Sequence, residues 1–170
     1  MSEHLLNTVK QFGHVKQHAL VIGDVMLDRY LIGDVARISP EAPVPIVLIK
    51  SEEVRAGGAA NVAANLALLG IPTHLVGCVG NDADAKALAQ LSKKSGIKAH
   101  LITSKLRPTV TKTRVLGGHQ QMVRLDKEDN AHFSAEEENA LWKGIQSEIA
   151  KNPGIVLLSD YAKGDRKSVV

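Results

Sequence analysis

Two glycines stand directly before a helical pattern, in the run Ala-Gly-Gly-Ala-Ala-Asn at residues 56–61. Glycines let a backbone approach a ligand closely, and a helix N-terminus offers N–H groups and the positive end of a dipole. Asn61 falls in the first turn, where its amide can donate to and accept from a sugar hydroxyl. Gly57, Gly58 and Asn61 are therefore a candidate ligand site. The alternative is a tight turn that packs a helix onto a strand.

Carboxylates follow two apolar runs that read as buried strands. Asp24 and Asp28 come after residues 18–23, and Asp160 follows residues 155–159, with Lys163 close behind. In open α/β sheets ligands bind beyond the carboxyl ends of strands, where a carboxylate can hold sugar hydroxyls. The alternative for each aspartate is a turn or cap without a ligand.

Three cations lie in a predicted β-hairpin over residues 109–126. Lys112 and Arg114 are two positions apart and so share one strand face, and Arg124 comes from the second strand. Cations grouped on one sheet suit a phosphate or a phosphosugar, which arginine can bind with two hydrogen bonds. The alternative is an ordinary solvated charged face.

The sequence predicts no metal site. Seven histidines are present, but only His14 and His18 have a spacing of four, and no further ligand lies near them in the sequence. The one cysteine, Cys78, excludes an intrachain disulfide and any multi-cysteine zinc site.

Alternating strand and helix patterns predict an α/β fold that brings these residues together. Strands are expected at 18–23, 44–50, 73–79, 100–103, 109–116, 121–126 and 155–159, the last of them buried. Helices are expected at 3–17, 59–69 (ended by Gly70 and Pro72), from Asp82 to Ser95, and from a capping box of Ser134 and Glu137.

Composition narrows the class of protein. The chain has 170 residues, 44% of them apolar, which suits one folded domain and excludes a disordered tail. A net charge of +3 without a basic run, and 3% aromatic residues, argue against nucleic-acid or membrane-surface partners. No signal peptide or transmembrane stretch is visible, so a cytoplasmic protein is expected.

Glycines, an asparagine and an alanine at fixed spacing resemble the signature of the ribokinase-like (PfkB) carbohydrate kinases. Within that family, several segments are similar to kinases that act on heptose 7-phosphate, and the likeness covers about residues 5–164. The signature positions are Gly57, Gly58, Asn61, Ala63, Gly70 and Gly80, and the similar segments are 23–30, 37–45, 111–114, 120–126 and 158–164.

The resemblance implies a fold and an activity. The fold would be α/β, a ribokinase-like doubly wound sheet with a small β lid, truncated after its N-terminal half. Residues 1–164 would be the N-terminal part of the kinase domain, with lid strands at about 29–35 and 44–50 and, in a wider reading, 109–126. The activity would be ATP-dependent phosphorylation of D-glycero-β-D-manno-heptose 7-phosphate at the anomeric hydroxyl, giving the 1,7-bisphosphate for ADP-heptose and lipopolysaccharide core synthesis.

The resemblance also implies roles, a cofactor and a partner. Mg²⁺ would accompany ATP, and the lid strands would form a homodimer. Asp160 and Lys163 would lie on the nucleotide side of the cleft. Sugar hydroxyls or the substrate phosphate would be held by Asp24, Gly57, Gly58, Asn61, Lys112, Arg114 and Arg124.

Two departures from the family pattern limit what this chain is expected to do. The Gly-Ala-Gly-Asp run that supplies the family's catalytic base does not occur, so the 170 residues alone are expected to be inactive. Residues 165–170 match the translation of a common sequencing adaptor and are expected to be artefactual. The alternatives are a non-catalytic fragment that binds a phosphosugar or dimerises, and another sugar kinase of the same family.

Overall fold

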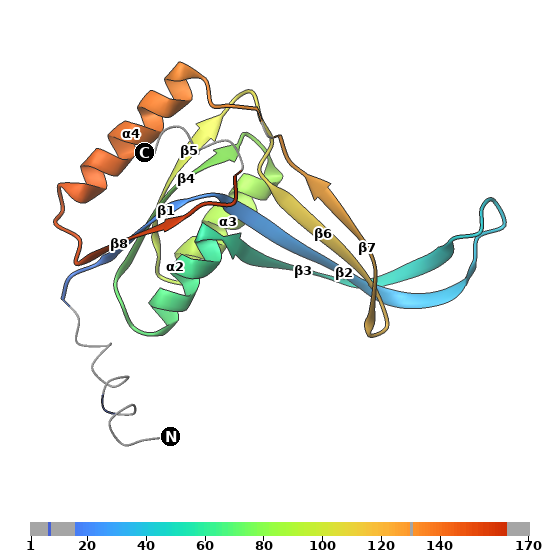
Figure 1. Ribbon diagram of the computed structural model, residues 1–170. Helices are drawn as coiled ribbons and strands as arrows, with labels where there is room; N and C mark the ends of the chain where they lie inside the picture. The colour runs from blue at the N-terminus through green and yellow to red at the C-terminus, as the bar shows by residue number, and fades with distance from the viewer. Residues whose placement is uncertain (1–6, 8–15, 130, 163–170) are drawn as a thin grey trace.

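The computed structural model describes Asn7, residues 16–129 and residues 131–162, which form two β-sheets and three helices (Figure 1). The helix expected over residues 3–17 lies almost wholly outside the described residues. Lys163 and residues 165–170 also lie outside them.

A four-stranded parallel sheet forms the body of the molecule. Its strands are β1 (Ala19–Gly23), β4 (Thr73–Gly80), β5 (Lys98–Ser104) and β8 (Ile155–Ser159), in the order β5-β4-β1-β8. Helices α2 (Ala59–Leu68) and α3 (Ala83–Lys94) bury apolar side chains against one face, and α4 (Ala135–Ile149) covers the other. This is the doubly wound arrangement that the sequence predicts.

Side chains of β1 point alternately into the two halves of the core. Val21 packs with Ala63 of α2 and Leu88 of α3, whereas Leu20 and Ile22 face Leu141 and Ile145 of α4. A strand buried on both faces needs a continuous apolar run, and Ala-Leu-Val-Ile at 19–22 supplies one. The parallel sheet therefore has a dry layer on each side.

A second sheet, the mixed sheet, extends away from this body as a long arm (Figure 1). Its strands are β2 (Val25–Ile38), β3 (Pro45–Gly58), β6 (Thr111–Gly117) and β7 (Gln120–Lys127), in the order β3-β2-β6-β7. Strand β2 pairs antiparallel with β3 and parallel with β6, and β6 pairs antiparallel with β7. The expected hairpin over 109–126 is therefore confirmed. Residues 29–35 and 44–50 are parts of longer strands.

Local capping signals set the helix ends where the sequence predicts them. The Asp82 side chain accepts a hydrogen bond from the Ala85 backbone N–H (3.0 Å) and begins α3. Ser134 and Glu137 form the reciprocal capping box that begins α4. Gly70 and Gly96 follow α2 and α3 with φ of +81° and +73°, the left-handed conformation that favours glycine after a helix.

Strand β8 is not the buried strand that its apolar sequence suggests. It lies at the edge of the parallel sheet, and Ile155 and Leu158 are 52% and 60% exposed. An apolar run indicates a strand but not its neighbours: Leu157 packs against the core beside α2, whereas Ile155 and Leu158 stay largely exposed. None of the helices described is both long enough and apolar enough to cross a membrane.

Candidate functional site

Asp24 lies at the junction of the two sheets. It is the single residue between β1 and β2, and it is 8% exposed. Its backbone N–H donates to Ser159 of β8 (3.0 Å), and its carboxylate Oδ2 accepts from the Tyr161 backbone N–H (2.7 Å). The end of β8 thus holds Asp24 at the carboxyl edge of the parallel sheet, where ligands of such sheets bind.

Gly57 and Gly58 end strand β3 beside Asp24. Gly58 has φ of +54°, and a Cβ there would lie 2.3 Å from the Asp24 backbone oxygen. A Cβ on Gly57 would lie 2.6 Å from Oδ2 of Asp28. Gly58 therefore requires glycine, for its backbone angle and for the close approach to the backbone, whereas a Cβ at Gly57 would meet the movable side chains of Asp28 and Met26. The glycine pair belongs to the end of a strand rather than to a free loop.

Helix α2 begins at this glycine pair without a side-chain cap. The Ala59 backbone N–H donates to the Asp24 oxygen (2.9 Å), which fixes the helix start against the strand junction. Asn61 lies in the first turn and is exposed. The structure therefore brings four of the predicted residues together: Asp24, Gly57, Gly58 and Asn61.

The three predicted cations also share one face, as the strand spacing indicates. In one cross-strand row of the mixed sheet, Asp28 of β2 pairs with Arg55 of β3 and with Lys112 of β6. In the next row, Tyr30 of β2 pairs with Arg114 of β6. We call this surface the charged face. Its members are Asp28, Tyr30, Glu53, Arg55, Lys112, Arg114, Arg124 and Asp126.

Each predicted cation already has a carboxylate partner. Arg114 donates to Asp28 (2.5 Å), and both Lys112 (3.0 Å) and Arg124 (2.8 Å) contact Asp126. The hydrogen bond that Arg114 donates to Asp28 raises the pKa of Arg114, and hydrogen bonds from Arg124 and Lys112 lower the pKa of Asp126. These pairs hold the cations in place, and an incoming phosphate would share or replace the carboxylates.

Tyr30 lies between two guanidinium groups on the charged face. Arg55 and Arg114 stand 4.8 Å and 5.3 Å from its ring centroid, within the range of cation–π contact. Arg55 is thus a fourth cation beside Asp28, and sequence reasoning missed it. The predicted strand 44–50 stops before Arg55, whereas β3 continues to Gly58, so strand alternation gave no reason to place Arg55 on this face.

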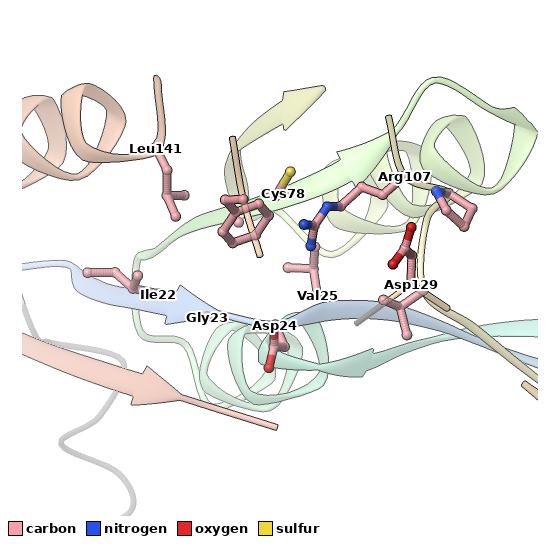
Figure 2. A pocket seen from close by; sticks show the side chains of 12 residues that line it. Ile22, Gly23, Asp24, Val25, Cys78, Arg107, Asp129 and Leu141 are labelled. Atoms are coloured by element: carbon pink, nitrogen blue, oxygen red, sulfur yellow. The ribbon is translucent and has the colours of Figure 1, made fainter. Parts of the chain in front are cut away.

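A small pocket opens beside Asp24 at the carboxyl ends of β1 and β4. Figure 2 shows Arg107, Cys78 and Asp129 around it. The Arg107 guanidinium stacks on the Phe133 ring at 4.1 Å and donates to the Ala131 oxygen (2.6 Å). Arg107 is a second cation that sequence reasoning missed, since it follows β5 in a segment with no motif. Burial raises the pKa of the Cys78 thiol to about 11, so this thiol is neutral at pH 7.

Asp160 lies one residue beyond β8, next to the loop that contacts Asp24. It is exposed, and its Oδ1 accepts from the Ala162 backbone N–H (2.6 Å). This contact is the turn that the sequence analysis gives as the alternative to a ligand role for Asp160. Asp160 and Asp24 follow adjacent parallel strands and share the same edge of the sheet.

A network of charges fixes the mixed sheet against helix α3. Asp82 accepts hydrogen bonds from the Thr109 hydroxyl (2.7 Å) and from Lys127 (3.1 Å), and Asp84 accepts from Arg29 (2.6 Å). Partial burial raises the pKa of Asp82, but hydrogen bonds from Thr109, the Ala85 backbone and Lys127 outweigh it and hold the pKa well below its usual value. This network leaves the charged face on the opposite side of the sheet open.

The chain matches a known family over most of its length. A profile of the pfkB family carbohydrate kinases matches residues 16–160. The bifunctional protein HldE of Methylobacillus flagellatus is 57% identical over 166 residues, which are 96% of this chain and 34% of that protein. HldE of Magnetococcus marinus is 51% identical over 154 residues, 88% of this chain and 31% of that protein. The chain thus spans about a third of the length of these curated relatives.

Solved structures share the fold at lower identity. A carbohydrate kinase from Agrobacterium tumefaciens superposes with a TM-score of 0.63 at 19% identity, covering 84% of this chain and 45% of that one. Arabidopsis thaliana ribokinase, solved with ribose and ATP, gives a TM-score of 0.55 at 24% identity, covering 85% and 45%. The ribokinase-like fold expected from the sequence is confirmed.

Proposed function

We propose a function from one premise: this chain belongs to the pfkB family of carbohydrate kinases. The chain would form the sugar-binding part of a kinase that transfers a phosphoryl group from ATP to the anomeric hydroxyl of heptose 7-phosphate. The product would be the 1,7-bisphosphate, a precursor of ADP-heptose. The proposal combines the 57% identity to HldE with the arrangement of the charged face.

The single observation that carries the proposal is the continuity between the glycine pair and the charged face. Asp28 lies over Gly57 and also contacts Arg114. A ligand whose hydroxyls reach Asp24 and the glycine backbone would therefore have its far end beside several cations. A sugar phosphate has this polarity, with hydroxyls at one end and a dianion at the other.

Two groups of residues divide the work on the substrate. Asp24 would accept hydrogen bonds from sugar hydroxyls, while the backbone at Gly57 and Gly58 allows close approach and Asn61 supplies both donor and acceptor. Lys112, Arg114 and Arg124 would hold the substrate phosphate. Arg107 and Asp24 line the same pocket, although Figure 2 shows their side chains pointing away from each other, so Arg107 would add positive charge on one side of that pocket.

Phosphoryl transfer depends mainly on positioning and on neutralising charge, which is the chemistry that Mg²⁺ supplies when bound with ATP. Mg²⁺ in such sites is held by one or two carboxylates together with substrate phosphates and water. The exposed carboxylate of Asp160, at the same sheet edge as Asp24, fits that requirement. We place the nucleotide on the Asp160 side, and Lys163 belongs to the same proposal.

We also propose that the mixed sheet is the lid over the sugar and the contact between two copies in a homodimer. One face of the mixed sheet carries paired charges, and α3 packs behind the base of the other face, so the rest of the sheet is exposed. Apolar side chains there that are 44–61% exposed are Val35, Ile38, Leu48, Ile49, Val123 and Leu125. Such exposure on strands suits burial against a second copy.

Arg114→Ala tests the phosphate assignment in the full-length protein that contains this chain. A charged hydrogen bond to phosphate is worth about 1.5–3 kcal/mol, so KM for heptose 7-phosphate should rise roughly 10- to 100-fold. KM for the same heptose without its phosphate should change less than about threefold. Coupled ATP-consumption assays with both sugars measure the difference.

Lys105→Ala is the matched control, because Lys105 is an exposed cation outside the charged face. Equal losses on both sugars would show that Arg114 supports the fold rather than the phosphate. Failure of the unsubstituted protein to phosphorylate heptose 7-phosphate, together with activity on another sugar, would assign a different member of the family.

A further inference from the structure

A cluster of metal-ligand side chains lies at the end of the parallel sheet opposite to Asp24. His18 precedes β1, His74 is the second residue of β4, and Glu148 is near the end of α4. The two imidazole rings stack with centroids 4.0 Å apart, and Nδ1 of His74 lies 2.6 Å from Oε2 of Glu148. All parallel strands begin at this end, so the cluster is separate from the candidate sugar site.

We propose that His18, His74 and Glu148 bind a zinc ion. One ligand atom from each residue lies within 4.8 Å of the others. In a tetrahedral site with bonds of about 2.1 Å the ligand atoms stand roughly 3.4 Å apart. Shifts of about 1 Å in the three side chains would close the widest separation and would open the 2.6 Å contact between His74 and Glu148. Two imidazoles and one carboxylate are a set that zinc accepts, with its fourth position open to water.

A buried nitrogen atom of His18 without a hydrogen-bond partner among the described residues is the observation that points to a ligand. Its Nε2 is buried, and within the described part of the chain this atom has no hydrogen-bond partner. Buried polar atoms are nearly always partnered, because losing water without a replacement is costly. Backbone carbonyls or hydroxyls could have satisfied this nitrogen, yet the groups beside it are another imidazole and a carboxylate.

The surroundings of Glu148 orient its carboxylate toward the two histidines. Lys151 donates to Oε1 (2.7 Å), which leaves Oε2 on the side of His74. Partners of this kind commonly fix the ligands of a metal site. A hollow lined by residues 98–101 reaches Glu148 from the surface and offers a route for an ion.

Positive charge near the three ligands limits their affinity for zinc. Lys151 and Lys98 both act electrostatically on His18, and both oppose a divalent cation. With three protein ligands and this opposition, binding should be weaker than in a closed four-ligand zinc site. The ion would join three segments that are far apart in the sequence, and would hold α4 against the starts of β1 and β4.

Zinc titration of the full-length protein that contains this chain tests the proposal. After removal of metals by a chelator and gel filtration, calorimetry should find one Zn²⁺ bound per chain at this site. His18→Gln should weaken that binding at least tenfold, because it removes a ligand whose Nε2 makes no hydrogen bond in the fold. His119→Gln is the matched control, since His119 is exposed in the β6–β7 turn, and it should bind zinc unchanged.

Co²⁺ supplies a second readout, because four-coordinate cobalt absorbs visible light far more strongly than the hydrated ion. The absorption should appear in the unsubstituted protein and be lost in Glu148→Gln, which retains the size of the side chain. No zinc uptake by the unsubstituted protein, or uptake that survives both His18→Gln and Glu148→Gln, would overturn the proposal. If one variant fails to fold by circular dichroism, the other decides.

Discussion

The parallel sheet and the mixed sheet differ in what covers them. Helices bury both faces of the inner strands β1 and β4 of the parallel sheet, and β1 is almost wholly apolar. The mixed sheet has α3 behind one side of its base and a row of paired charges on the other. Hydrogen-bonded strands therefore support a buried apolar layer in the parallel sheet and a solvent-exposed charged surface in the mixed sheet.

The difference separates two ways of building a binding site. At the end of the parallel sheet, Asp24 and Gly58 are placed by backbone contacts that tolerate almost no change. On the mixed sheet, Arg114 and Lys112 are partly exposed side chains, which can exchange one partner for another. The body would fix the position of a ligand, and the arm would supply charge to recognise it.

Gly58→Ala should have the largest effect, because it attacks the junction of the two sheets. Gly58 has φ of +54° and ψ of −134°, a backbone region that only glycine adopts readily and that costs another residue about 1–3 kcal/mol, and the new Cβ would overlap the Asp24 oxygen at 2.3 Å. We expect a total loss of about 3 kcal/mol or more in the free energy of unfolding, measured by urea denaturation.

Gly118→Ala is the matched control for this comparison. Gly118 also has a positive φ, +62°, but no described atom lies within 4 Å of its missing Cβ. Its substitution should cost only the backbone component, about 1–2 kcal/mol. Equal losses for the two variants would mean that contact with Asp24 contributes nothing.

Asp82→Asn should have a smaller effect, because it weakens the attachment of the arm to the body. The asparagine side chain can still cap α3, but the charged hydrogen bond from Lys127 is lost. This loss should lower the free energy of unfolding by about 1–3 kcal/mol at pH 7. Hydrogen bonds hold the folded-state pKa of Asp82 below its unfolded value, so its contribution is complete above about pH 5 and is lost as pH falls below about 4.

Denaturation of the two proteins at pH 7 and at pH 3.5 measures this change, and the difference between them should shrink in acid. Asp34→Asn is the control, because Asp34 is paired with Lys50 on the exposed part of the same sheet and should contribute under about 1 kcal/mol. A difference that stays constant with pH would assign the effect of Asp82→Asn to something other than its charge.

Leu48→Asp should have the smallest effect on the folded chain, because Leu48 is 56% exposed. If the arm joins two copies, the charge should weaken dimerisation of the full-length protein about tenfold or more, while urea denaturation changes by less than about 0.5 kcal/mol. Sedimentation velocity measures the first quantity. Ala99→Asp adds the same charge on exposed β5 and should leave dimerisation unchanged.

Short-range signals in the sequence predicted much of this fold. The caps at Asp82 and Ser134 and the glycines at 70 and 96 act within a few residues, so the bounds of α3 and α4 could be inferred. The pairing of Lys112 and Arg114 on one face follows from strand alternation alone. The assembly of Asp24 with Gly57 and Gly58 was expected from the family signature.

Contacts between distant segments escaped prediction. Arg55 reached the charged face because β3 continues beyond its expected end. His18, His74 and Glu148 meet because two parallel strands begin and helix α4 ends at the same edge of the sheet.

The length of β2 has a mechanical consequence. This strand runs from Val25, beside Asp24, to Ile38 at the far end of the arm, with register irregularities after Ile32 and Val35, and its 14 residues span at most about 46 Å. A rotation of about 5° at its base, where the two sheets meet, would move the tip by about 4 Å over that span. A second protein that held the tip would therefore resist small rotations at the junction around Asp24 through a long lever arm.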